Sequence, residues 1–415
     1  MVRRDYSQTE SDANPEKELL MRPRLHALVV IAACASFLLA LGHAFVISIT
    51  AGALAPQSKP LYDIALVDSF SGAQRQTSRN IEFGAKLAIN QANSSGRLPF
   101  RLALVVYNTT GDSTRAASIA RQVVANQRVI AIVGPTITTD VESVAPLTSL
   151  ARLALVTPSA TYPPLATSGW TDFFRVPPDD GVQGVADANF LVSSKGASRL
   201  FIVSDGTPYG SLIAASVIKQ ANALGATTMA HLAPATTQCQ AGSGDASQYH
   251  NVALSALASQ ATALFYGGYY CDFGLLLNSL KNVGFHGVVM SGNGSDSPAL
   301  LNAVSSPSSV DGVYLSSSSV TSSNASFNKS FASLAHYSAQ GATFAPESFD
   351  ATNAIINALK SLKNVSRPAV VSALRRVSFT GVSGKIRFQA NGNLQYSRAF
   401  LNQVQGPAIS PVGAI

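Results

Sequence analysis

The sequence predicts an α/β fold in two lobes, with parallel sheets flanked by helices and a ligand cleft between the lobes. Two short apolar runs, Val129–Val133 and residues 153–156, are separated by a segment with helical spacing. This alternation of short apolar runs and helices is typical of a parallel sheet. It starts again after PPDDG at residues 177–181, the first strong break in the chain, and this restart predicts a second lobe.

Each lobe is predicted from its own run of strands and helices. Ile81, Ala85, Ala88 and Ala92 are spaced i, i+4, i+7 and i+11, so they give a helix of the first lobe one apolar face. The other elements expected in the first lobe are strands at residues 63–67, 102–107, Val129–Val133 and 153–156 and a helix near 113–127. The elements expected in the second lobe are strands at Arg199–Ser204, Thr227–Leu232, 262–267, 287–290 and 312–315 and helices at 209–224, 249–259 and 272–283.

The later segments are expected to return to both lobes. Helices are predicted at residues 327–340, 346–363 and 368–376, and β-like segments follow. We therefore expect the first lobe to comprise residues 62–178 and 317–376, and the second lobe to comprise residues 179–316 and 377–415.

An apolar segment near the N-terminus indicates export. Residues 25–55 are predicted to be a signal or membrane-anchor segment, because residues 25–49 are apolar and long enough to span a bilayer. Arg22 and Arg24 precede this segment, and no charge follows it before Lys59. The positive-inside rule therefore places the rest of the chain on the extracytoplasmic side.

The fate of this segment stays open between three interpretations. Residues 1–24 read as a disordered cytoplasmic tail, which is long for a secretory signal and favours an uncleaved membrane anchor. The A-x-A triplet at residues 51–53 would suit a cleaved signal peptide, and the sequence before Cys34 resembles a lipoprotein cleavage box. All three interpretations export the remaining chain.

The distribution of charge argues against nucleic-acid binding. Beyond residue 56 the chain holds 24 Lys and Arg against 17 Asp and Glu, so this part carries the net charge of +7. The basic residues are scattered singly, whereas a nucleic-acid surface concentrates them with aromatic residues, so we expect no nucleic-acid partner.

The motifs of common enzyme classes are missing from the sequence. No nucleophile elbow, phosphate-binding loop or dinucleotide fingerprint occurs, and the six histidines have no spacing typical of metal ligands. We therefore expect no catalytic residue, no metal and no cofactor, and we predict that the protein is not an enzyme.

Small hydroxyl residues follow both apolar runs of the first lobe. Thr136, Thr138 and Thr139 come after the first run, and Thr157, Ser159 and Thr161 come after the second. In parallel sheets ligands bind beyond the carboxyl ends of the strands, where these hydroxyls are expected. Hydroxyls and the free N–H groups of a helix start suit a small anion such as a carboxylate. The pattern indicates ligand binding rather than catalysis.

Several consecutive motifs strongly resemble the leucine/isoleucine/valine-binding proteins. They are IVGPTITTDVESVAPLTSLARLALVTPSATYPPL, FIVSDGTPYGSLI, ALFYGGYYCDFG with the LLLNSLKNVGFHGVVMSGNGSD that follows, and GVSGKIRFQANGNL. The resemblance covers about residues 62–394. It implies the type I periplasmic-binding-protein fold, in which two hinged lobes close on a small solute that is passed to an ABC transporter.

The resemblance also implies which residues contact the ligand. Thr138, Ser159 and Thr161 match the positions of lobe one that hold the α-carboxylate and ammonium of an amino acid. Tyr209 and Tyr269 match the aromatic positions of lobe two, where a ring gives apolar area and a hydrogen-bonding tip.

The chain departs from the family at the residue that pairs with the ligand's ammonium. The family has an acid in this loop, whereas SGNG at residues 291–294 places Asn293 there. A neutral amide cannot form the charge-assisted bond that an ammonium needs, and the register argues against Asp296 as its substitute. Thr77 also replaces an aromatic residue of the family. We expect branched-chain amino acids to bind weakly, while an amide, a carboxylate or another small polar solute remains open.

Two cysteines of the exported part are expected to form a disulfide. Cys239 and Cys271 each follow a predicted strand, so neighbouring strand ends would bring them together in an oxidising compartment. The alternative is a pair of unrelated buried thiols.

These observations predict an extracytoplasmic solute-binding protein that captures a small polar ligand, of amino acid, amide or carboxylate type, for an ABC permease. We expect it to be held to the membrane by its N-terminal segment. The alternative is the ectodomain of a ligand-sensing receptor or regulator on the same fold. The short N-terminal tail, which has no recognisable signalling domain, favours transport.

Overall fold

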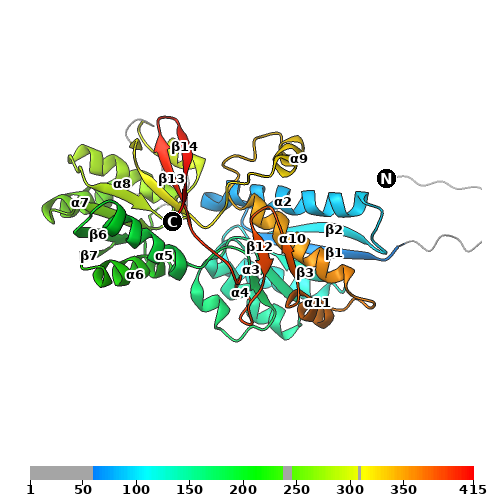
Figure 1. Cartoon of the computed structure of the whole chain (residues 1–415). Coiled ribbons are helices and arrows are strands. Elements are labelled where there is room, and N and C mark those ends of the chain that lie inside the picture. Colours follow the sequence, from blue (N-terminus) through cyan, green and yellow to red (C-terminus); the bar gives the residue numbers. More distant parts are fainter. Residues whose placement is uncertain (1–58, 237–244, 307–309) are drawn as a thin grey trace, which may run out of the picture. The chain divides into compact units, whose positions relative to one another are not determined.

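The computed structural model describes residues 59–236, 245–306 and 310–415 (Figure 1). The segments predicted as a tail (1–24) and as a signal or anchor (25–55) lie outside the described residues. Among the helices of the described part, none combines the length and the apolar character that a membrane span requires. Residues from Lys59 onward form one compact unit, and two sheets organise it into the two lobes described next.

Lobe one is built on a parallel sheet of five strands. Their order is β2 (Arg101–Asn108), β1 (Leu61–Asp68), β3 (Val129–Val133), β4 (Ala154–Thr157) and β5 (Phe173–Arg175). The strands β3 and β4 are buried along their whole length, as expected of continuous apolar runs with helices on both faces. The sequence predicts β1 to β4 but not β5, which is only three residues long.

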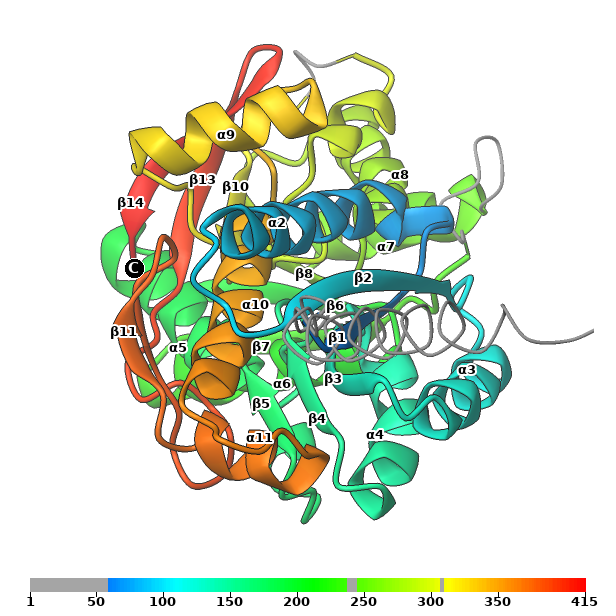
Figure 2. The same ribbon diagram turned by 90° about the vertical axis from the view of Figure 1, so that its right-hand side faces the viewer.

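Helices cover both faces of this sheet. They are α2 (Arg75–Ser94), α3 (Ser113–Ala125), α4 (Thr138–Leu150), α10 (Ala345–Lys360) and α11 (Arg367–Leu374), while α9 (Ala325–Ala335) packs on α2 rather than on the sheet. The predicted apolar face of α2 is confirmed, because Ile81, Ala85, Ala88 and Ala92 are all buried. Helix α10 runs beside α2 (Figures 1 and 2), and a side chain at Gly84 would collide with the Ala345 carbonyl oxygen.

Lobe two contains a mixed sheet of seven strands. Their order is β14 (Ala408–Ala414), β13 (Phe400–Gln405), β10 (Tyr314–Ser317), β9 (Val288–Ser291), β8 (Ala263–Gly267), β6 (Arg199–Ser204) and β7 (Thr227–Leu232). The strands β6 to β10 are parallel to one another. At one edge β13 pairs antiparallel with β10, and β14 pairs antiparallel with β13. The helices are α5 (Asp180–Asn189), α6 (Pro208–Ala223), α7 (Ala246–Ala258) and α8 (Tyr270–Asn282).

The chain returns to lobe two later than the sequence suggested. The expected return lay near residue 377, but the hairpin of β11 (Ser378–Thr380) and β12 (Lys385–Arg387) belongs to lobe one. The reason is the burial of apolar side chains, because Ile386, Phe388 and Leu394 pack in the core beneath β1 and β3. The chain rejoins the second sheet only at β13, where Phe400 pairs with Ser317.

Candidate ligand-binding site

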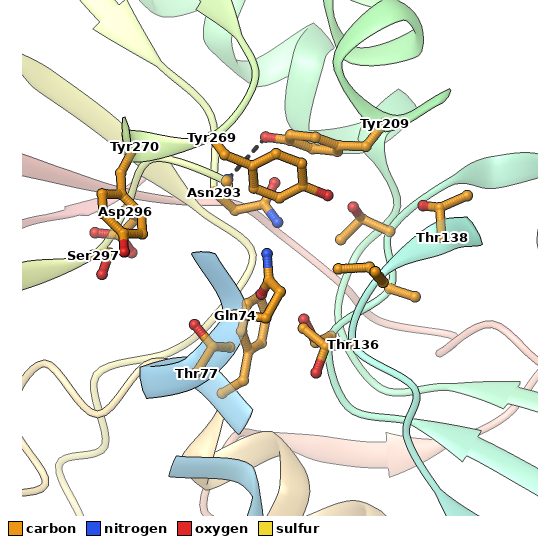
Figure 3. A pocket seen from close by; sticks show the side chains of 16 residues that line it. Gln74, Thr77, Thr136, Thr138, Tyr209, Tyr269, Tyr270, Asn293, Asp296 and Ser297 are labelled. Atoms are coloured by element: carbon orange, nitrogen blue, oxygen red, sulfur yellow. Dashed lines mark hydrogen bonds between the residues drawn. The ribbon is translucent and has the colours of Figure 1, made fainter. Parts of the chain in front are cut away.

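A pocket lies between the two lobes, at the ends of their strands (Figure 3). Lobe one lines it with Gln74, Thr77, Thr136, Ile137, Thr138, Ser159, Ala160, Thr161 and Phe344. Lobe two lines it with Tyr209, Tyr269, Tyr270, Asn293, Gly294, Asp296 and Ser297. All six residues predicted to contact the ligand therefore line one pocket, although the first and the last of them, Thr138 and Asn293, are more than 150 residues apart in the sequence.

The first part of the lobe-one wall is the loop from β3 to α4. Gly134 has a φ of 97°, and a side chain there would meet the Val67 carbonyl oxygen at 2.3 Å, so only glycine fits. Thr136 is fixed to Asp68: its hydroxyl donates to Oδ2 (2.5 Å) and its N–H donates to Oδ1 (3.1 Å). Helix α4 then begins without a side-chain cap at Ile137. Its first N–H groups are therefore free to bind a negative or polar ligand atom beside Thr138.

The second part of this wall is the turn that follows β4. Thr157 organises it, since its hydroxyl oxygen accepts from the Ala160 N–H (2.9 Å) and donates to the Pro135 carbonyl (2.8 Å). These bonds tie the two loops together and place Ser159 and Thr161 at the pocket beside Thr138. The wall thus presents hydroxyls and backbone N–H groups on a rigid frame.

Two tyrosines form the opposite wall. The rings of Tyr209 and Tyr269 lie 5.6 Å apart between centroids at an angle of 41°. Thr207 caps the start of α6 by accepting from the Gly210 N–H (3.0 Å), which positions Tyr209 in the first turn. The Tyr209 hydroxyl oxygen accepts from the Gly294 N–H (2.9 Å). Burial raises the pKa of both phenols well above their usual range, so both stay neutral hydrogen-bonding groups.

The loop after β9 brings Asn293 into the pocket. Its side-chain oxygen is buried and has no hydrogen-bond partner among the described residues. Asp296 lies at the opposite end of the pocket from Thr138 (Figure 3). One of its oxygens accepts from the Asn402 amide (3.0 Å), and burial raises its pKa to about 6. Asp296 is the one ionisable acid in the lining, which contains no Lys, Arg or His.

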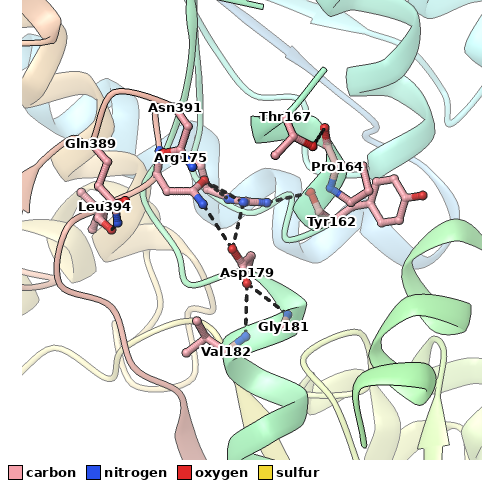
Figure 4. Close-up of polar contacts among 11 residues, drawn as sticks. Tyr162, Pro164, Thr167, Arg175, Asp179, Gly181, Val182, Gln389, Asn391 and Leu394 are labelled. Atoms are coloured by element: carbon pink, nitrogen blue, oxygen red, sulfur yellow. Dashed lines mark hydrogen bonds and ion pairs between the residues drawn. The ribbon is translucent and has the colours of Figure 1, made fainter. Parts of the chain in front are cut away.

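Arg175 and Asp179 form an ion pair where the chain crosses from lobe one to lobe two (Figure 4). Arg175, at the end of β5, is fully buried. It donates to the Tyr162 carbonyl (2.8 Å), to the Asn393 side chain (2.7 and 3.1 Å) and to Asp179 (3.3 Å). Asp179 also caps α5 by accepting from the N–H groups of its first turn. This network joins the first crossover, between β5 and α5, to the segment that precedes the third crossover, between β12 and β13.

Buried carboxylates accompany the first and second crossovers. Neither carboxylate oxygen of Asp180 has a hydrogen-bond partner at normal distance among the described residues, and burial raises its pKa to about 7. Glu347, at the start of α10, accepts from the Ser319 hydroxyl (2.8 Å) and the Val320 N–H (2.6 Å). Burial raises the pKa of Glu347 to about 8. Both acids are mostly protonated or close to their titration midpoint at neutral pH.

Sequence reasoning missed several residues of the pocket. Gln74 lies in the loop after β1 that the sequence marks only as rich in Ser and Gly, and its position there carries no pattern that a strand or helix would show. Phe344 arrives from a segment that is distant in sequence, immediately before α10. Gln74 and Phe344 reach the same pocket only through the tertiary fold, so the sequence carries no signal for them.

Two further expectations concern cysteine and metal. Cys271 forms a disulfide, while Cys239 lies outside the described residues, so the pairing of these two cysteines stays a prediction. Within residues 59–236, 245–306 and 310–415, no group of His, Cys, Asp and Glu side chains is arranged to hold a metal ion.

Known proteins resemble this chain in sequence and in fold. A curated relative, the leucine-, isoleucine-, valine-, threonine- and alanine-binding protein of Pseudomonas aeruginosa, is 27% identical over 53% of this chain and 57% of its own length. The chain spans less than two thirds of the length of each of the first curated relatives, at 66%, 57% and 61%.

Among solved structures, a leucine-binding protein of Thermotoga maritima matches with a TM-score of 0.75 and 22% identity, over 85% of this chain and 98% of that one. A solute-binding protein of R. palustris in complex with benzoate matches with a TM-score of 0.71 and 14% identity, over 85% of this chain and 96% of that one. The model of the periplasmic binding protein family matches residues 62–407. The chain therefore belongs to the periplasmic binding protein family.

Proposed function

We propose that this protein is an extracytoplasmic solute-binding protein, which captures a small polar ligand between its lobes and delivers it to an ABC permease. The observation that carries the proposal is the pocket itself. One wall offers hydroxyls and the free start of α4, and the other offers two neutral tyrosines and an amide. Family membership and the names of the relatives support the same function.

The two walls would hold different parts of the ligand. Thr138, Ser159 and Thr161 would bind a carboxylate or another polar acceptor, together with the first N–H groups of α4. Tyr209 and Tyr269 would cover the apolar part of the ligand, and their hydroxyls would add hydrogen bonds. No wall residue needs to exchange a proton for this binding, which suits capture and release of an unchanged solute.

The relatives, more than the pocket, indicate which class of ligand to expect. The Pseudomonas relative is named for branched-chain and other small amino acids, and the R. palustris neighbour holds benzoate, a carboxylate without an ammonium. A small carboxylate without an ammonium is therefore within the chemistry that this fold accepts. We also propose that the N-terminal segment exports the binding part and anchors it to the membrane, close to its permease.

A thermal-shift screen of the full-length protein tests this function. The probes are amino acids, amides, ureas and small carboxylates, and at least one of them is expected to raise Tm, because a ligand that binds only the folded state stabilises it. In the variant Tyr269→Ala the shift should disappear, and in the control Tyr396→Ala, which changes an exposed tyrosine outside the pocket, it should persist. Equal shifts in both variants would place the ligand elsewhere and contradict the proposal.

A further inference from the structure

Two carboxamide side chains from opposite lobes face each other across the pocket. Gln74 ends the short helix η1 (Gly72–Gln74) of lobe one, directly before α2. Asn293 belongs to the loop after β9 of lobe two. Figure 3 shows both side chains pointing toward one another from the two sides of the pocket. A ligand bound between the lobes therefore meets an amide on each side.

The hydrogen-bonding capacity of this pair is unfilled. The Asn293 side-chain oxygen is buried without a partner among the described residues, and a buried unpaired acceptor is costly until a donor reaches it. An Asn amide turns by a half-rotation, so either its N–H group or its carbonyl oxygen can face the ligand. Gln74 brings a second N–H donor and a second carbonyl acceptor. The pair suits a ligand group that both donates and accepts.

The surroundings of the pair carry no charge that would hold a cation. Asp296 lies to one side of the pair, away from Thr138, and one of its carboxylate oxygens accepts from the Asn402 amide. Asp180 does not line the pocket, because it is fully buried behind it at the start of α5. A ligand ammonium between Gln74 and Asn293 would lose its hydration without gaining a carboxylate, which is unfavourable.

We propose that the group held between Gln74 and Asn293 is a neutral amide or urea group, so that the protein takes an amide-bearing solute rather than a free α-amino acid. This inference rests on the proposed solute-binding function and specifies its ligand class. The ligand's carbonyl oxygen accepts from one side-chain amide, and its N–H donates to the carbonyl oxygen of the other. The remainder of the ligand, a carboxylate or a small apolar group, lies toward Ser159 and Thr161.

Four probes that share an isopropyl group test the ligand class by calorimetry on the full-length protein. They are valine, N-carbamoylvaline, isobutyramide and isobutyrate, which differ in whether they carry an ammonium, a ureido group, a carboxamide or a carboxylate alone. N-carbamoylvaline and isobutyramide are expected to bind at least about tenfold more tightly than valine and isobutyrate, the factor that about 1.4 kcal/mol produces.

Two charge-introducing variants test the residues. Gln74→Glu and Asn293→Asp each replace an amide by a carboxylate of the same shape, so each should weaken the amide probes and strengthen valine. The matched controls are Gln76→Glu and Asn302→Asp, which add the same charge at exposed positions outside the pocket lining. The controls should leave the order of the four probes unchanged.

Two results would overturn the inference. The first is valine binding at least as tight as either amide probe, which leaves the solute-binding function intact; if Asp180→Asn then abolishes valine binding, Asp180 is the acid that pairs with the ammonium. The second is a lack of binding by all four probes. In that case the inference fails, and the solute-binding function is decided separately by the thermal-shift screen.

Discussion

The pocket and the crossovers behind it differ in how they use charge. The pocket is lined by hydroxyls, tyrosines and amides, with Asp296 as its one acid. The crossovers hold a fully buried arginine and several buried carboxylates. The two regions are adjacent, yet the pocket offers a ligand mainly neutral groups, whereas the crossovers connect the lobes through ionisable ones.

This difference separates two properties of the protein. The hydroxyls, tyrosines and amides of the pocket keep the same state over a wide pH range, so recognition by these groups, away from Asp296, should depend little on pH. Buried ionisable groups depend strongly on their partners and on pH, so the stability of the crossovers should depend on both. Changes in one region should therefore leave the property of the other region largely unchanged, and each prediction below tests that separation.

The largest expected effect is on stability, from Arg175→Met. Removing the buried guanidinium takes the ion-pair partner from Asp179 and the charged donor from the Asn393 side-chain oxygen, at a cost of about 3–5 kcal/mol. Urea unfolding of the ligand-free protein measures this loss. The control is Arg79→Met, which breaks the exposed pair with Glu82 and should cost less than about 1 kcal/mol. Equal losses in both variants would show that the Arg175 network does not fasten the crossovers.

The next effect is on binding, from Tyr269→Ala. Removing this partly buried ring should weaken binding by about 2 kcal/mol, which corresponds to roughly 30-fold, for whichever solute raises Tm in the screen. Calorimetry measures the affinity, and the unfolding midpoint of the ligand-free variant should shift less than that of Arg175→Met. The separation of the two regions would be wrong if Tyr269→Ala destabilised the ligand-free protein as much as Arg175→Met does.

A third effect concerns pH and Glu347. Burial raises its pKa from 4.5 to about 8, so the folded state binds more protons than the unfolded state between these values. Its contribution to the free energy of unfolding is therefore full below about pH 4.5 and falls by about 1.4 kcal/mol per pH unit up to about pH 8.

The variant Glu347→Gln isolates this contribution. It should remove the part of the pH slope that lies between pH 7 and 8, because most other buried carboxylates titrate at lower values. Asp187, whose pKa is also raised well above its usual range, contributes in both proteins and cancels in the comparison. Urea unfolding at several pH values provides the measurement, and an unchanged slope in the variant would count against a buried, protonated Glu347.

The smallest effect is expected at the hydroxyl wall. Ser159→Ala removes one hydrogen bond to the ligand and should weaken binding by about 1 kcal/mol without a change in its pH dependence. Thr139→Ala removes an exposed hydroxyl in the first turn of α4, outside the pocket lining; it is the control and should bind as the unmodified protein does. Calorimetry at pH 6 and pH 8 checks both statements at once. A strong pH dependence of binding in the unmodified protein would show that an ionisable group takes part in recognition.

The sequence predicted most of the fold because local patterns determine it. Fully buried strands such as β3 appear as apolar runs, and the face of α2 appears in the spacing of Ile81, Ala85, Ala88 and Ala92. The return to lobe two was placed too early because β12 and β13 have similar amphipathic patterns. Only the burial of Ile386 and Phe388 against lobe one tells them apart.

The candidate site was predictable to a similar extent. Ser159, Tyr269 and Asn293 lie within recognisable motifs, and all three line the pocket. Gln74 and Phe344 escaped because neither lies in a motif and both are brought to the pocket by packing of distant segments. The Arg175 network escaped for the same reason, since Asn393 is 218 residues away from Arg175 in sequence.

The late return of the chain to both lobes has a consequence for biosynthesis. Lobe one lacks α10, α11 and the β11–β12 hairpin until residue 387 has been made, and lobe two lacks β13 and β14 until residue 414. Leu401 and Val404 complete the core of lobe two only then. A nascent chain therefore cannot complete either hydrophobic core before these late segments have been synthesised.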